Sequence, residues 1–475
     1  MGLGKVGFVL LLGVLCVKCL SDKEILNWRS LADKIQHLPE LDEMPEFSMF
    51  SGYLEVTQGK SLHYWLNECT DPSSNKLIIW YNGGPGCSSM DGLFAEHGPY
   101  KFGSDGRLQK NPYTWNRLAH TLYIESPVGV GFSYSENPKE TLDDDKVAHD
   151  NRLALENFFL KFPSYRGYEI YISGESYGGV YAPTLVNEII QDGSWMMDNI
   201  RGVIIGNGLL DRRLNSDSSV YFAYYHGLFG ESMWSELHRY CCTEESCSFS
   251  TFFHEDCMIK VSKVNHIMNN EGLNLYNLYA NCASESEDAR LRHSREKRST
   301  IEDLIYQSPL SMEKPAEHSN LKLVPVCSNA SLLTSYLNKP AVQEAIHVRQ
   351  KEWEVCNEAV LALYRKIYDD MTSTIKDIMD SLDDVRMLLY FGDIDMACNF
   401  MGGEQFFDRL GYEIMTPRRK WRAVAEDGSS QVAGFWKDYD RISFVTVKGA
   451  GHMVPTDKPR EAYVMLERFL NEEPL

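Results

Sequence analysis

A serine lies between two closely spaced glycines in the stretch Gly174-Glu175-Ser176-Tyr177-Gly178. Residues 168–173 before it form an aromatic and β-branched run typical of a buried strand, and residues 180–190 after it have the character of a helix. Glycines permit the strained dihedral angles and the close packing of a sharp strand-to-helix turn. A serine on such a turn is well placed to attack a substrate, so we predict that Ser176 is a nucleophile.

A serine hydroxyl is a weak nucleophile until a base accepts its proton and an acid orients that base. In chains with this kind of turn, the acid and then the histidine follow the serine in sequence. Asp393 and Asp395 follow one apolar run, and His452 follows another, in a glycine-flanked loop. The sequence alone does not decide between the two aspartates. Other histidines lack a comparable setting at the end of a predicted strand; they include His97, His149 and His347.

Short apolar runs that end in glycine or acidic residues predict the strands that position these groups. They cover residues 77–81, 121–124, 202–205, 385–391 and 442–447. Helical stretches such as residues 145–159 separate them, which predicts a mostly parallel central sheet. Together with the serine turn and the order of serine, acid and histidine, this indicates an α/β-hydrolase core. In such a sheet the functional side chains collect at the carboxyl ends of the strands.

The middle of the chain differs in composition from the rest. Residues 209–327 have few strand signals and many cysteines, so we predict an inserted, disulfide-rich cap domain. The core would then have a first part, residues 21–208, and a second part, residues 328–475. Within the cap, residues 283–320 are polar and include the dibasic pair Lys297-Arg298. Two interpretations of this stretch stay open: an exposed loop, or a protease-sensitive segment that is excised on activation.

Charge and targeting signals bound the function. The formal net charge of −20 argues against nucleic acid as a partner. Lys5 precedes an apolar run over residues 6–17, which is typical of a secretory signal peptide and too short for a membrane span. We place that peptide at about residues 1–20 and expect no membrane span elsewhere. Passage through the secretory pathway agrees with the glycosylation sequon at Asn329.

Cysteines 241–257 lie near two histidines and could be considered as zinc ligands, but no CxxC pair supports that interpretation. In an oxidising compartment most of the cysteines should instead form disulfides. We therefore expect neither a metal ion nor a cofactor.

Four motifs together resemble the signatures of the serine carboxypeptidases. They are residues 82–89 (Asn-Gly-Gly-Pro-Gly-Cys-Ser-Ser), 174–179, 392–399 and 451–455. The resemblance extends from about residue 35 to the C-terminus. It implies that Asp395, and not Asp393, is the acid partner of His452. It also implies an oxyanion hole formed by the backbone N–H groups of Gly84 and Tyr177.

The resemblance further implies that Asn82, the N–H of Gly83, Glu96 and Glu175 bind the substrate's terminal carboxylate. Two acids can face an anion only if they are protonated and donate hydrogen bonds, which would give the enzyme an acid pH preference. The implied activity is that of an acid serine carboxypeptidase, which releases C-terminal amino acids from peptides through an acyl-enzyme.

A disulfide pattern also follows from the resemblance, and spacing alone could not have chosen it. The implied pairs are Cys87–Cys356, Cys241–Cys257, Cys242–Cys247 and Cys282–Cys327. Cys398 is then a free thiol near Asp395, and Cys69 has no partner in this scheme.

Residues 221–228 and the Cys241-Cys242 pair resemble lysosomal members of the family. This implies a lysosomal or secreted location, a homodimer, and lysosomal glycosidases as partners that the protein stabilises. Two other functions stay open. An esterase or lipase on the same fold should lack Asn82, Glu96 and Glu175 together, whereas all three are present. A mainly scaffolding role would leave no reason for a complete set of serine, histidine and acid.

Overall fold

The computed structural model describes residues 30–137, 141–244, 246–251, 254–270, 273–281 and 330–475. Several predictions concern residues outside these ranges. They are the signal peptide, the Cys282–Cys327 disulfide, the glycosylated Asn329 and the candidate excision segment 283–320.

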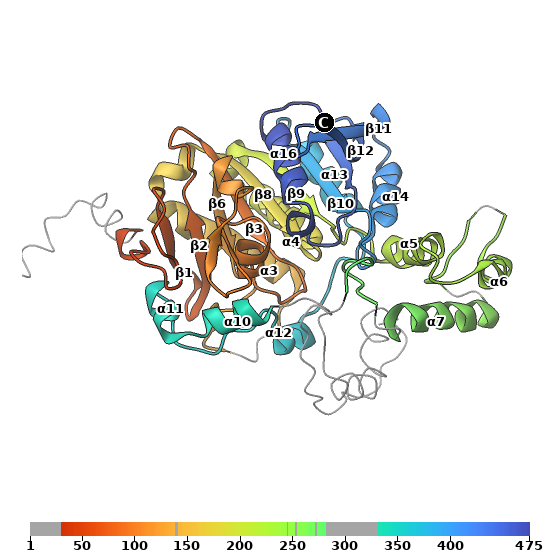
Figure 1. Cartoon of the computed structure of the whole chain (residues 1–475), viewed down its shortest axis with the longest axis horizontal. Helices are drawn as coiled ribbons and strands as arrows, with labels where there is room; N and C mark the ends of the chain where they lie inside the picture. The colour runs from red at the N-terminus through yellow and green to blue at the C-terminus, as the bar shows by residue number, and fades with distance from the viewer. Residues whose placement is uncertain (1–29, 138–140, 245, 252–253, 271–272, 282–329) are drawn as a thin grey trace, which may run out of the picture.

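Within the described residues, eleven strands form one twisted sheet with the order β1-β2-β6-β3-β8-β9-β10-β13-β12-β11, and β7 pairs with β2 (Figure 1). Six neighbouring strands run parallel: β6, β3, β8, β9, β10 and β13. Their bounds are His120–Ile124, Lys76–Tyr81, Glu169–Glu175, Ile200–Gly206, Arg386–Gly392 and Ile442–Val447. These six strands confirm the runs predicted from the sequence, and the α/β-hydrolase core is confirmed with them.

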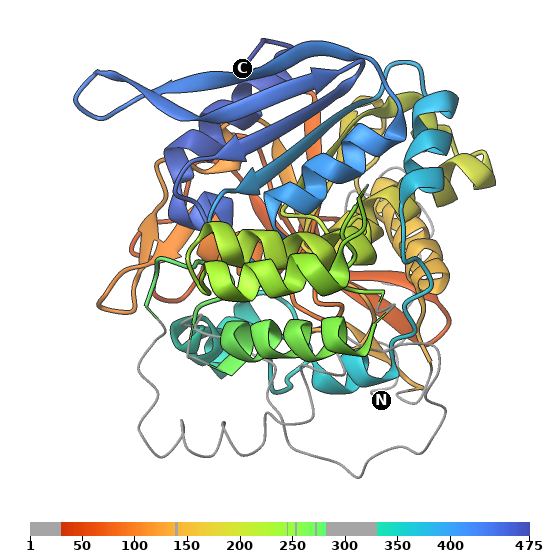
Figure 2. The same cartoon turned by 90° about the vertical axis from the view of Figure 1, so that its right-hand side faces the viewer.

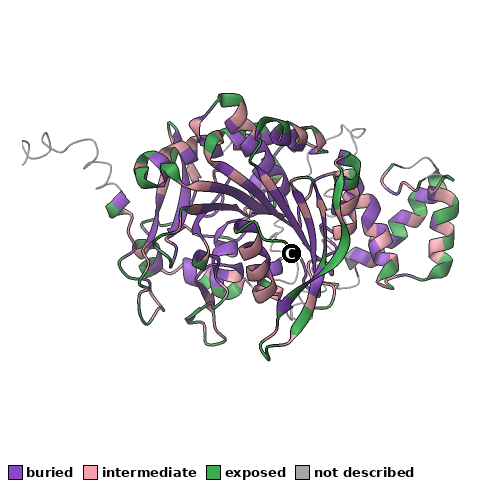
Figure 3. Cartoon of the chain, turned by 90° about the horizontal axis from the view of Figure 1, so that it is seen from above, coloured by how far each residue is buried: buried purple, intermediate pink, exposed green. Residues whose placement is uncertain are grey.

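Two hydrophobic cores sandwich the sheet, because successive side chains of a strand point to opposite faces. In β3, for example, Leu77 and Ile79 face one core, while Ile78 and Trp80 face the other. The first core is covered by α3 (Asp144–Lys161), α4 (Gly178–Asp192), α13 (Thr372–Ser381) and α14 (Phe400–Leu410). The second is covered chiefly by α10 (Ser331–Leu337), α11 (Pro340–Ala345) and α16 (Pro459–Leu470). Figure 3 shows the strands between these layers to be largely buried.

Antiparallel hairpins extend both ends of the sheet. β1 (Met49–Thr57), β2 (Lys60–Asn67) and β7 (Tyr134–Ser135) lie at one end, and β12 (Ser430–Tyr439) and β11 (Ile414–Val424) at the other. The edge strand β11 is mostly exposed and carries a proline and four basic residues, which discourage pairing with another sheet. Outside residues 209–327, the other strands and α-helices in the described residues are β4 (Tyr100–Phe102), β5 (Leu108–Lys110), α12 (Glu358–Leu363) and α15 (Val454–Asp457). Four short helical segments complete the named elements there: η1 (Gly92–Glu96), η2 (Trp115–Arg117), η3 (Pro163–Gly167) and η4 (Trp195–Asn199).

Three helices in the region predicted as a cap have a small core of their own. They are α5 (Arg212–Tyr225), α6 (Glu231–Cys241) and α7 (Glu255–Asn270), and they lie side by side at the front of Figure 2. Phe222, Leu237 and Val264 are among the buried side chains that join them. The Asp217 carboxylate of α5 accepts hydrogen bonds from the backbone N–H groups of Phe249 and Ser250. These bonds fix the loop between α6 and α7 against α5. Met396, which follows β10, also packs into this core.

Candidate functional site

Ser176 occupies the sharp turn between β8 and α4, with a left-handed φ of +60°. Its side chain is partly exposed, although its neighbours are buried. A hydrogen bond to the end of β9 fixes the turn, because the Ser176 N–H donates to the Gly206 carbonyl at 3.0 Å. A Cβ on Gly174 would lie 2.8 Å from the Tyr81 carbonyl oxygen, so the turn packs too closely on the end of β3 for a larger residue. The strained backbone presents the hydroxyl away from the sheet.

His452 and Asp395 meet beside this turn, because β8, β9, β10 and β13 are consecutive parallel strands. His452 Nδ1 donates to Asp395 Oδ2 at 2.8 Å, and both side chains are buried. The Asp395 carboxylate also accepts from the side-chain amide of Asn207 at 2.8 Å and from the N–H of Ala397 at 2.9 Å. These donors fix the orientation of the carboxylate. The proton on His452 Nδ1 leaves Nε2 free to act as a base.

Asp393 has different contacts. Its carboxylate accepts the N–H of Gly449 at 2.6 Å, in the turn that precedes His452. Burial raises the pKa of this carboxyl, and the Gly449 bond opposes the shift. Asp393 therefore supports the histidine loop, whereas Asp395 contacts the imidazole itself.

The loop that carries Gly83 and Gly84 packs directly on the serine turn. A Cβ on Gly83 would lie 2.5 Å from the Tyr177 nitrogen and 2.8 Å from the Ser176 Cβ. Gly84 has a φ of +115°, which favours glycine. The N–H groups of Gly84 and Tyr177 thus belong to two adjoining segments, next to the serine.

Three side chains of the predicted carboxylate-binding set gather at the same edge of the sheet. The Asn82 amide donates to Glu96 Oε1 at 3.4 Å, and its oxygen accepts from the Trp80 indole at 2.7 Å. Glu96 and Glu175 share a hydrogen bond between their carboxyl groups. Both are buried, and the second oxygen of each has no hydrogen-bond partner among the described residues.

Two carboxyls that share a hydrogen bond must hold at least one proton between them. Burial raises the pKa of Glu175 well above its usual range, and the neighbouring Glu96 raises it further. Burial also raises the pKa of Glu96, although hydrogen bonds from Glu175 and Asn82 oppose this. Asp91 adds a third acid whose pKa rises to about 7 through burial and the proximity of Glu96. The cluster is therefore suited to neutral carboxyl groups at acid pH.

Sequence reasoning missed three residues of this site. Asn207 follows β9 between two glycines, which is a strand-end signal that could have indicated its contact with Asp395. Asp91 lies two residues after the 82–89 motif, but no sequence pattern marks it as part of the site.

Tyr276 is the third, and nothing in the sequence indicates its position. Its carbonyl accepts the N–H of His452 at 2.6 Å, and its ring lies 4.8 Å from the imidazole, centre to centre. Nearby, the Leu275 carbonyl accepts the N–H of Met396, and the Asn277 amide donates to Asp457 at 3.0 Å. Residues 275–277 are thus fixed against both the aspartate loop and the histidine loop.

The described cysteines form three disulfides: Cys87–Cys356, Cys241–Cys257 and Cys242–Cys247. These are the pairs that the resemblance implies for these residues. Cys398 and Cys69 are free and buried. Cys398 lies next to Ser176 and Asp395, and burial strongly raises the pKa of its thiol.

One group of side chains in the described residues has the spacing of a metal site: His238, Cys242 and Cys247. The two sulfurs are bonded to each other, so neither is available as a thiolate ligand. Only the exposed imidazole of His238 could then bind an ion.

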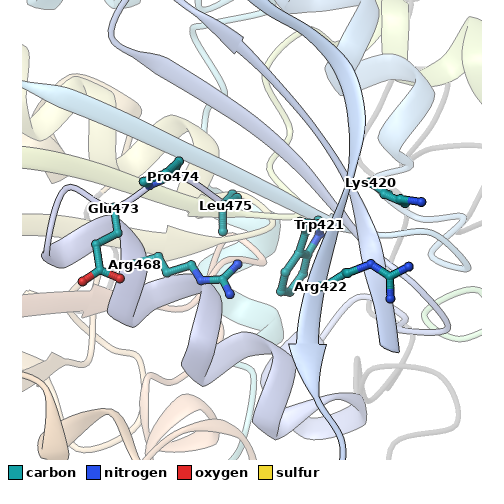
Figure 4. A pocket seen from close by; sticks show the side chains of 7 residues that line it. All are labelled: Lys420, Trp421, Arg422, Arg468, Glu473, Pro474 and Leu475. Atoms are coloured by element: carbon teal, nitrogen blue, oxygen red, sulfur yellow. The ribbon is translucent and has the colours of Figure 1, made fainter. Parts of the chain in front are cut away.

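A shallow hollow of about 550 Å³ lies at the outer edge of the sheet, beyond β12 (Figure 4). Arg468 and the buried Trp421 are on one side of β11, while Lys420 and Arg422 point to the other. These cations do not converge on a common point. The hollow is also remote from Ser176, since β9, β10, β13 and β12 separate β8 from β11.

None of the helices in the described ranges has both the length and the apolar character that a membrane crossing requires.

Comparisons with known proteins agree with this geometry. A model of the family described as serine carboxypeptidase matches residues 39–472. The lysosomal protective protein of Mus musculus is 42% identical over 467 residues, covering 95% of this chain and 97% of the relative. Serine carboxypeptidase ctsa-4.1 of Caenorhabditis elegans is 36% identical over 454 residues, covering 93% of each. Among solved structures, Kex1(delta)p, a prohormone-processing carboxypeptidase from Saccharomyces cerevisiae, has a similar fold, with a TM-score of 0.71 at 23% identity over 93% of this chain and 96% of that one.

Proposed function

The chain belongs to the serine carboxypeptidase family and acts on peptides, and from that premise we propose that it uses Ser176, His452 and Asp395 to release C-terminal amino acids at acid pH. The observation that carries the proposal is the buried cluster of Asn82, Glu96 and Glu175 beside the serine turn. An enzyme that only had to cleave esters or internal amides would have no use for neutral carboxyl groups at this position.

The chemistry follows from the contacts. The Ser176 oxygen attacks the carbonyl carbon of the last peptide bond while His452 Nε2 accepts the hydroxyl proton. The N–H groups of Gly84 and Tyr177 stabilise the oxyanion that forms. His452 then donates its proton to the departing amine, and the C-terminal amino acid leaves. A water molecule, deprotonated by the same nitrogen, hydrolyses the acyl-enzyme and restores the serine hydroxyl.

Recognition of the chain end would depend on protonation. A neutral Glu96–Glu175 pair and the Asn82 amide can each donate a hydrogen bond to a carboxylate, and the Gly83 N–H adds another. When the pair ionises, the donors are lost and like charges repel the substrate. Peptide binding should therefore weaken as pH rises, whereas the acylation machinery is unaffected by this change.

The direct test is digestion of a peptide of known sequence at acid pH, followed by mass spectrometry. We expect residues to leave one at a time from the C-terminus, and we expect a C-terminally amidated copy of the peptide to be cleaved much more slowly. Ser176→Ala should abolish release from both. Internal cleavage, or equal rates on the amidated peptide, would refute the proposed recognition of the chain end.

The inserted region, residues 209–327, is proposed as a cap that controls access to the site. Support comes from residues 275–277, which bind the loops of Asp395 and His452 immediately before the segment 283–320. Cleavage within that segment would free one end of the 275–277 stretch. Purified precursor should then gain peptidase activity on limited proteolysis at Lys297-Arg298. Full activity of the uncut chain would refute this activation step.

A lysosomal location and a protective role toward glycosidases are the finer parts of the proposal. Their support is the resemblance to the lysosomal protective protein and the expected acid preference. Fractionation of cells should recover the protein with lysosomal markers. Co-purification should retain glycosidases with Ser176→Ala as well as with the wild type, because stabilisation would not require catalysis. We also propose a homodimer, which light scattering of the purified protein would test.

A further inference from the structure

A second hydrogen-bonded set of serine, histidine and acid side chains is buried in the core. Ser51 Oγ lies 2.9 Å from His63 Nε2, and His63 Nδ1 lies 2.8 Å from Glu125 Oε2. The order of contacts is the same as in a catalytic triad. All three side chains have 0% of their surface exposed.

This group cannot act as a second nucleophilic site. The Ser51 hydroxyl donates its proton to the Ile346 carbonyl at 2.7 Å, so it accepts, rather than donates, the bond from His63 Nε2. His63 Nδ1 donates to the Glu125 carboxylate. Both ring nitrogens of His63 are thus engaged in buried hydrogen bonds, one to Ser51 and one to Glu125. Neither a base nor space for a substrate is left.

The carboxylate of Glu125 is the centre of the group, and it accepts four hydrogen bonds. One oxygen accepts from His63 and from the N–H of Phe132 at 2.7 Å. The other accepts from the Trp353 indole at 2.9 Å and from the Ser88 hydroxyl. Burial alone would raise the pKa of Glu125, but the hydrogen bond and charge of His63 and the bonds from Ser88 and Phe132 lower it overall.

Ser88 links this buried acid to the loop that carries Gly84. Ser88 belongs to the 82–89 motif, and its N–H also donates to the Val355 carbonyl at 2.7 Å. The next residue, Ser89, donates to the Ile124 carbonyl at 2.6 Å and accepts from the N–H of Asn82 at 3.1 Å. Ser88 and Ser89 therefore tie the end of this loop to Ile124 and Glu125, and Ser89 links that anchor back to Asn82.

We propose that Glu125 is a positioning residue for the oxyanion hole, because its carboxylate fixes Ser88 and thereby the Gly84 N–H beside the serine turn. The inference rests on the proposed function, in which the Gly84 N–H stabilises the oxyanion. That stabilisation is the same for peptides and esters, because both pass through a tetrahedral oxyanion. A displaced donor should lower kcat for both substrate classes, whereas KM stays nearly constant.

The test uses Ser88→Ala, because substitution of Glu125 itself would leave His63, the Phe132 N–H and the Trp353 indole without their buried acceptor and could unfold the protein. Ser88→Ala leaves the other three donors to Glu125 in place. We expect kcat to fall by a common factor of about 10 or more for a peptide and an ester, with KM within about twofold of the wild type.

Ser133→Ala is the matched control. Ser133 is equally buried, donates to the Glu125 backbone carbonyl at 2.6 Å and accepts the backbone N–H of His63 at 2.8 Å. These hydrogen bonds go to the Glu125 and His63 backbone rather than to the 82–89 loop. It should lower the melting temperature and leave kcat within about twofold of the wild type.

Ser88→Ala would overturn the proposal if it lowers the melting temperature as Ser133→Ala does and keeps kcat, since Glu125 would then be structural only. An increase confined to the KM of the peptide would also overturn it, because the loop would then serve Asn82 and Gly83 rather than the oxyanion. Failure of the proposed function would give a different result from failure of the positioning role of Glu125. If the proposed function failed, the wild type itself would not release C-terminal residues, or Ser176→Ala would remain active.

Discussion

At the scale of single residues, the unusual feature is a pair of buried acids in a site that we propose to bind the terminal carboxylate of the substrate. Glu96 and Glu175 form a hydrogen bond to each other, and burial raises the pKa of both. A carboxyl group kept neutral in this way is a donor of the same geometry as an amide. The side chain of glutamine should therefore replace the protonated form of either glutamate, but not the ionised form.

Glu96→Gln should show this difference in the KM for a peptide. At acid pH we expect a value within a few-fold of the wild type, because the amide donates as the neutral acid does. Near neutral pH the variant should have the lower KM, since it cannot ionise. Steady-state kinetics at the two pH values measure the effect, with the exposed Glu55→Gln as a control that follows the wild type. An unchanged KM at neutral pH would remove Glu96 from the site.

At the scale of elements, the site depends on how closely the Gly83 loop approaches the turn between β8 and α4. A Cβ on Gly83 would meet the backbone nitrogen of Tyr177 at 2.5 Å and the carbonyl oxygen of Glu175 at 2.6 Å. Backbone atoms of the turn cannot move aside as a flexible side chain could. The loop would have to shift, and the Gly84 N–H would shift with it.

Gly83→Ala should therefore lower kcat/KM for peptides and esters by about 100-fold or more, the loss expected when an oxyanion donor is removed. The control is Gly167→Ala, because a Cβ there meets no atom within 4 Å. That variant should retain wild-type kinetics. A Gly83→Ala enzyme with near-normal kcat/KM would contradict the described packing.

The same scale explains what could be predicted from sequence. The six parallel strands were predictable because each is a short apolar run closed by glycine or a polar residue, and the structure places each within two residues of its predicted ends. The hairpin of β11 and β12 was not predictable from the sequence, because β11 is exposed and basic and lacks the apolar alternation of a half-buried strand. The residues by themselves did not decide between Asp393 and Asp395, since both follow β10 and only the path of the turn decides which one meets His452; the family resemblance was needed to choose Asp395. Tyr276 lies far from every motif in sequence and meets the site through tertiary packing alone.

At the scale of the whole molecule, the buried acids connect function to stability. A carboxyl whose pKa is higher in the folded than in the unfolded chain binds its proton more tightly when folded. Its contribution to stability is fully present below the unfolded pKa, about 4.5 for glutamate, and is lost as pH rises toward the folded pKa. The site thus favours folding under the same acid conditions that we propose to favour peptide binding.

Glu175→Gln should remove much of that dependence. As pH is raised from about 4.5 to neutrality, the melting temperature of the wild type should fall progressively relative to that of the variant. The reason is that only the wild type has a buried carboxyl at this position that ionises more readily in the unfolded chain than in the folded one. Differential scanning calorimetry of both proteins over this range gives the comparison. Melting temperatures that change in parallel would mean that Glu175 has an ordinary pKa in the folded chain.

The central claim is that neutral carboxyl groups bind the terminal carboxylate of the substrate, and the pH dependence of KM tests it most directly. KM should be measured from about pH 4.5 to 8 for a peptide with a free C-terminus and for an ester that lacks a free carboxylate. We predict that the KM for the peptide rises steeply above about pH 6, while the KM for the ester stays nearly constant. Profiles that superimpose for the two substrates would contradict the account.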